Sequence, residues 1–157
     1  MIDGLKDFFR RYVEPAGQQD KAGGEHALQV ATAALMLEMM RMDSRIAAEE
    51  REAIADSMRR EFRLRDDEFA AIHELAEQAA HKAHDYYQFT SLINKNCDAG
   101  QKLRIVENLW RVAMADGHLD AHELHLMRKL ADLLYIGHAD YIAAKQRARE
   151  AMKLPPV

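Results

Sequence analysis

Cysteine, proline and long hydrophobic runs are scarce in this chain, and each scarcity excludes a class of protein. The single cysteine, Cys97, has no partner for an internal disulfide, which excludes a fold stabilised by disulfide bonds. The longest stretch without a charged residue, His26 to Leu37, is far shorter than the roughly 20 apolar residues of a membrane-spanning helix, so no transmembrane helix is expected. Only three prolines and seven glycines occur in 157 residues, while 48% of the residues are hydrophobic, which favours a helix-rich globular domain.

The charge of the chain also narrows its class of partners. The formal net charge is −4 and the pI is near 6.1, whereas a nucleic-acid-binding protein needs a concentrated basic face to neutralise phosphates. No nucleic-acid partner is therefore expected. The first nine residues place acids among their apolar residues and contain no small-residue cleavage site, so no signal peptide is predicted and the expected location is cytoplasmic.

The N-terminal segment, residues 1–24, differs in pattern from the rest. Apolar residues recur every three to four positions over the first dozen residues, which predicts a short amphipathic helix. Residues 14–24 then break the pattern and predict a flexible linker. The helix has no excess of cations, so docking on the protein body is favoured, a partner comes second, and peripheral membrane contact through residues 1–12 is disfavoured.

The remaining chain predicts one helical domain over residues 25–152, followed by a tail, 153–157. Apolar stripes of helical period mark its elements. The first predicted helices cover residues 26–42 and 47–62. A long helical segment then begins at residue 66 and reaches Ile93, either without a break or with a restart near Thr90. The last predicted helices cover residues 103–115, 124–134 and 139–151, and Gly137 is the predicted C-cap of the second of these.

Two stretches of this domain are similar at an offset of 73 positions. Asp43, Ile46 and Glu50 match Asp116, Leu119 and Glu123 without a gap. Further matches follow at the same offset, with Phe62 opposite Tyr135, Asp67 opposite Asp140, and Phe69 opposite Ile142. We therefore expect an all-α compact bundle of about seven to eight helices, built from two repeats, about 26–93 and 100–151, related by a pseudo-two-fold axis.

The two acidic turns of the repeat are the only candidate site, and two interpretations compete. Asp116, Asp120 and Glu123 place several carboxylates within eight residues, and a pseudo-two-fold axis would bring Asp43 and Glu50 near them, which would make a divalent-cation site. Alternatively, Asp120 is the N-cap of the following helix and Glu123 completes a capping box, as any helix-turn-helix joint requires. The first turn has Ser44 and Ala47 where the second has Gly117 and Asp120, so a cation site would be asymmetric.

Histidines are the secondary metal candidates, namely His118 and His122. Zinc sites often use two histidines on one helix face, but these two straddle a predicted helix start, and His122-Glu123-Leu124-His125 lacks the metalloprotease spacing. No nucleophile motif and no phosphate-binding glycine loop occurs, so no catalytic residues are predicted.

The run from Leu109 to Glu123, Leu-Trp-Arg-Val-Ala-Met-Ala-Asp-Gly-His-Leu-Asp-Ala-His-Glu, resembles the tellurite-resistance TerB-like family, and the resemblance covers about 26–149. It implies an all-helical domain with an internal repeat, an association with tellurite and other chemical stress, a metal-chelating acidic surface, and participation in larger assemblies. We therefore expect a non-enzymatic module that binds a divalent cation or a protein partner through its acidic turns. The alternative is a structural interaction scaffold, with self-association as one form, in which the acids are helix caps.

Overall fold

The computed structural model of the chain describes residues 7–13, 21–43, 46–81, 87–115 and 121–153. Every regular element in these ranges is a helix, which confirms the all-α bundle expected from the sequence. None of the helices in the described ranges is long and apolar enough to cross a membrane. The elements are η1 (Phe9–Val13), α2 (Lys21–Met42), α3 (Ala48–Phe62), α4 (Asp66–His81), α5 (Tyr87–Asn96), α6 (Ala99–Ala115), α7 (Ala121–Leu133) and α8 (His138–Ala151).

Helix α2 is the centre of the core. Its side chains from Ala27 to Met40 are buried almost without interruption, so the helix is apolar on all sides, as expected for an element surrounded by others. It contacts α3, α4, α6, α7 and η1. The methionines Met36, Met39 and Met40 are among the buried residues, where their flexible side chains fill the core.

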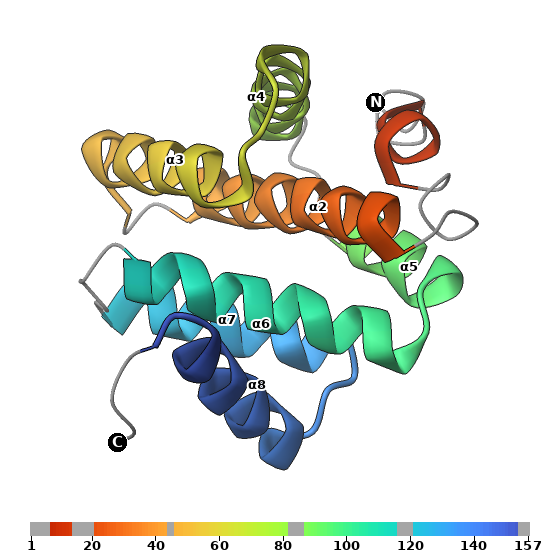
Figure 1. Cartoon of the computed structure of the whole chain (residues 1–157). Helices are drawn as coiled ribbons and strands as arrows, with labels where there is room; N and C mark the ends of the chain where they lie inside the picture. The colour runs from red at the N-terminus through yellow and green to blue at the C-terminus, as the bar shows by residue number, and fades with distance from the viewer. Residues whose placement is uncertain (1–6, 14–20, 44–45, 82–86, 116–120, 154–157) are drawn as a thin grey trace.

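The two halves of the domain are stacked, with α2 and α6 between the outer helices. Figure 1 shows α4 crossing the outer side of α2 and α8 crossing the outer side of α6, and these two pairs have the most extensive helix-helix contacts. Helices α2 and α6 both end, at Met42 and Ala115, at the same side of the molecule, where α3 and α7 begin. These helix ends are 73 positions apart, as are the starts of α3 and α7, Ala48 and Ala121, which is the offset of the sequence matches. The pseudo-two-fold relation itself stays a prediction.

The ends of α3 and α7 also use the same capping geometry. Arg63 (φ 52°) and Tyr135 (φ 59°) adopt the left-handed conformation. The next residues, Leu64 and Ile136, are buried and donate their backbone N–H to carbonyls five residues back, at 3.1 and 2.9 Å. This is the Schellman arrangement, in which a buried apolar residue fixes the chain after the helix.

The prediction that Gly137 is the C-cap of α7 is wrong. Gly137 has φ −68° and ψ 159°, an extended conformation, and it is the N-cap of α8. Tyr135 takes the left-handed position instead, two residues earlier, because this register buries Ile136.

The N-terminal segment docks on the bundle. Phe8 and Phe9 are buried, and their rings contact the edge or face of Phe89 of α5 at centroid distances of 6.3 and 6.4 Å. Docking, predicted from the apolar stripe, is thus confirmed for these residues. The boundary of the predicted linker at residue 24 differs from the structure, since α2 already begins at Lys21. A glycine in a helix costs only about 1 kcal/mol relative to alanine, so a long packed helix can extend through Gly23 and Gly24.

Candidate functional site

The first acidic turn is built around backbone hydrogen bonds and a helix cap. The carbonyl of Asp43 accepts a hydrogen bond from the N–H of Ile46 at 3.2 Å, which closes the turn between α2 and α3. Oε1 of Glu50 lies 3.5 Å from the backbone N–H of Ala47 and caps the first turn of α3. Because Ala47 has no side-chain acceptor, only the Glu50 half of a capping box is present. At this turn the contact between Glu50 and Ala47 therefore supports the interpretation of the acids as helix caps.

Most of the second acidic turn lies outside the described residues. This applies to Asp116, His118 and Asp120, and to the side chains of His122 and Glu123. The backbone of Glu123 occupies the third position of α7, as Glu50 does in α3. Among the residues that are described, no group of three or more histidine, cysteine or acidic side chains is arranged to hold a metal ion. The five-carboxylate cation site stays a prediction.

Helix α6 shows a complete capping box that the sequence analysis missed. Gln101 donates its backbone N–H to Oδ1 of Asp98 at 2.8 Å, and Oε1 of Gln101 accepts from the backbone N–H of Asp98 at 2.8 Å. The signal was present as an acid followed three positions later by glutamine, within a stretch assigned to a turn.

A buried carboxylate at the start of α4 is another feature that the sequence did not single out. Glu68 is only 2% exposed. It accepts a hydrogen bond from the backbone N–H of Arg65 at 2.8 Å, and both of its oxygens lie within 3.0 Å of Nε2 of His26 on α2. The sequence pattern indicated only that Glu68 lies near the start of a helix, but its contacts show that it caps α4 and joins it to α2.

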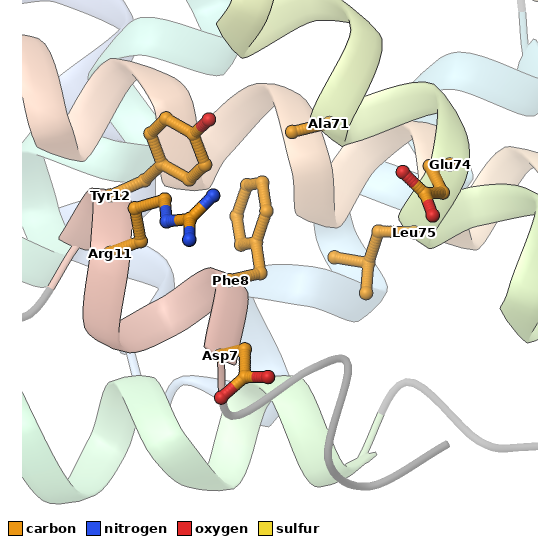
Figure 2. Close-up of a pocket in the computed structure, with 7 residues that line it drawn as sticks. All are labelled: Asp7, Phe8, Arg11, Tyr12, Ala71, Glu74 and Leu75. Carbon is orange, nitrogen blue, oxygen red and sulfur yellow. The ribbon is translucent and has the colours of Figure 1, made fainter.

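A first surface pocket of about 250 Å³ lies between η1 and α4. Figure 2 shows the rings of Phe8 and Tyr12 on one wall, Leu75 on the other, and Glu74 on the α4 side. The two rings are 5.1 Å apart and tilted. The pocket combines these apolar groups with three charged residues, Asp7, Arg11 and Glu74.

A second pocket of about 380 Å³ lies where α2, α3 and α4 meet. The guanidinium of Arg41 contacts both carboxylate oxygens of Glu77, and the guanidinium of Arg51 donates to the carbonyl of Ile46 at 3.2 Å. Partial burial, and then the nearby positive charge of Arg41, lower the pKa of His73 below its usual value. The imidazole is therefore neutral near pH 7 and can donate or accept a hydrogen bond.

The only thiol is not activated. Burial raises the pKa of Cys97 to about 11, and the negative charge of Asp98 acts in the same direction. A thiol with this pKa is almost entirely protonated near neutral pH, and the thiolate is the reactive form. Neither of the two pockets is lined by a cysteine or a serine.

Comparison with known families agrees with the helical architecture. The family described as tellurite resistance protein TerB matches residues 29–146, which is most of the chain and spans α2 to α8. Comparisons with curated protein sequences and with solved structures give no match. The matched region includes both acidic turns and the pocket formed by α2, α3 and α4. The chain therefore belongs to the tellurite resistance protein TerB family.

Proposed function

We propose that this protein is a non-catalytic, cytoplasmic interaction module in resistance to tellurite and related chemical stress, and that it binds a protein partner at the end of the bundle where α3 and α7 begin. The contact of Glu50 with the backbone N–H of Ala47 carries this proposal, because it gives the acidic turn a structural role as a helix cap. The unactivated thiol and the absence of cysteine and serine from the linings of both pockets support a non-catalytic role.

The partner surface is tested by charge reversal at that end. Glu49 is exposed in the first turn of α3 and has no capping contact among the described residues, so Glu49→Lys changes the surface charge without removing a cap. We expect Glu49→Lys combined with Asp116→Lys to reduce growth in tellurite at least tenfold in a strain that depends on this protein. The control, Glu150→Lys, reverses an exposed charge near the end of α8 and should leave growth unchanged. Full protection by the double variant, at an unchanged melting temperature, would contradict the proposal.

A divalent cation at the same end is the second candidate. The observation that favours it is that α2 and α6 end, and α3 and α7 begin, on the same side of the molecule (Figure 1). Five carboxylates from the two turns could supply the oxygen ligands that calcium or magnesium prefers.

The two candidates predict different responses to metal. If a cation binds, calcium, magnesium or zinc should stabilise the wild type by about 2.7 kcal/mol at a hundredfold excess over the Kd. Asp116→Ala combined with Glu123→Ala should abolish that shift in melting temperature. If the acids only cap helices, Asp120→Ala should cost about 1 kcal/mol with or without metal, and none of the three ions should shift the wild type.

A further inference from the structure

We propose that the pocket between α2, α3 and α4 binds a small zwitterion of the aliphatic amino-acid class. The site adjoins the interaction surface proposed above at the start of α3, but it is lined by side chains of three helices and includes none of the acids of the two turns. Its volume of about 380 Å³ lies within the range of small-molecule sites.

The base of the pocket is apolar. Leu37 of α2 and Ala76 of α4 line it and are only 3% and 2% exposed, and the exposed Ala48 of α3 adds a third apolar group. Buried side chains on packed helices give a fixed surface, which suits an aliphatic side chain better than a charged one.

The charged groups on the walls are balanced, and two of them are available. Arg41 and Glu77 are engaged with each other across α2 and α4. Arg51 bonds only the backbone carbonyl of Ile46, and Glu52 makes no ion pair or hydrogen bond within the described ranges. One guanidinium and one carboxylate, from consecutive positions of α3, thus remain for a ligand.

His73 also lines the pocket, and because it is neutral near pH 7 it does not alter the balance of positive and negative charges there. Its ring packs edge-on against Phe69 at a centroid distance of 4.5 Å, which fixes its orientation. The imidazole lines the pocket together with Arg41 of α2 and Glu52 of α3, and it also interacts electrostatically with Asp56 of α3. As a neutral group it can donate or accept one hydrogen bond.

This arrangement selects for a ligand with both charges. A carboxylate group can form charge-assisted hydrogen bonds with Arg51, and an ammonium group can do the same with Glu52. A ligand that lacks either group loses one of these two charge-assisted hydrogen bonds, so it binds more weakly. The aliphatic side chain then lies on Leu37, Ala48 and Ala76.

Calorimetric titration of the full chain with L-leucine tests the proposal. We expect saturable one-to-one binding, weakened at least tenfold for 4-methylpentanoate, which lacks the ammonium group, and for 3-methylbutylamine, which lacks the carboxylate. Arg51→Gln and Glu52→Gln should each weaken leucine binding at least tenfold. Arg60→Gln, an exposed substitution on α3 outside the pocket, is the matched control and should leave it unchanged.

Three results would overturn the proposal, namely no saturable heat with leucine, equal affinity for leucine and an analogue, or equal affinity of the two pocket variants and the wild type. Melting curves of all variants show that each is folded. Because the assay involves neither tellurite nor a protein partner, its failure is distinct from a failure of the proposed interaction function.

Discussion

Phe89→Ala is expected to lower the free energy of unfolding by about 3–5 kcal/mol. Phe89 is completely buried, and its ring contacts both Phe8 and Phe9. Removing it leaves a cavity between α5 and the N-terminal segment and removes the edge contacts that hold η1. For a chain of this length the melting temperature should fall by roughly 6–20 °C.

The fluorescence of Trp110, the only tryptophan, is a suitable probe of that transition because its side chain is buried in α6. Phe89→Leu keeps most of the volume and should cost less than half as much. A double-mutant cycle with Phe8→Ala should give a coupling of about 0.5–1.5 kcal/mol, the usual contribution of an aromatic pair. A coupling near zero would show that Phe89 does not hold the N-terminal segment.

Trp110→Ala is expected to cost about 3–5 kcal/mol as well, for a different reason. Trp110 is 3% exposed, packs against the ring of Tyr141 of α8 at a centroid distance of 5.1 Å, and donates its Nε1–H to the carbonyl of Tyr141 at 3.2 Å. The substitution removes both interactions from the contact between α6 and α8, one of the two largest helix-helix contacts of the domain. Urea unfolding followed by circular dichroism measures the loss.

Trp110→Phe separates the ring from the hydrogen bond. It keeps an aromatic side chain against Tyr141 but removes the indole donor and part of the buried ring volume, so it should cost about 1–3 kcal/mol, less than Trp110→Ala. If Trp110→Phe were as destabilising as Trp110→Ala, the hydrogen bond would outweigh the packing, contrary to the burial of this side chain.

Helix α6 was predictable because its apolar stripe is strong. Val106, Leu109, Trp110 and Ala113 recur at helical spacing, and all four are buried in α6. Helix α3 likewise follows its predicted bounds within one residue, with Ile54, Met58 and Phe62 buried. A period of 3.6 residues is a local property of the chain, so it can be recognised without knowing the neighbours of the helix.

Helix ends and polar contacts were less predictable. Gly137 was the favoured C-cap by residue type, but the burial of Ile136 places the left-handed residue at Tyr135. The contact of Glu68 with His26 joins positions 42 residues apart, and no local pattern indicates such a pair. These features depend on which helices pack together, since tertiary burial outweighs intrinsic cap preferences of about 1 kcal/mol.

The sequence by itself determined the helical class, the family, the core stripes and the positions of the two acidic turns, because these depend on residue type and spacing along the chain. Only the tertiary structure decided that α2 and α6 end on one side, that Phe8 and Phe9 dock on Phe89, and that Arg51, Glu52 and His73 surround one pocket. The reason is physical, because these features join helices that are separated in sequence, and the helices meet only when their apolar faces are buried against one another.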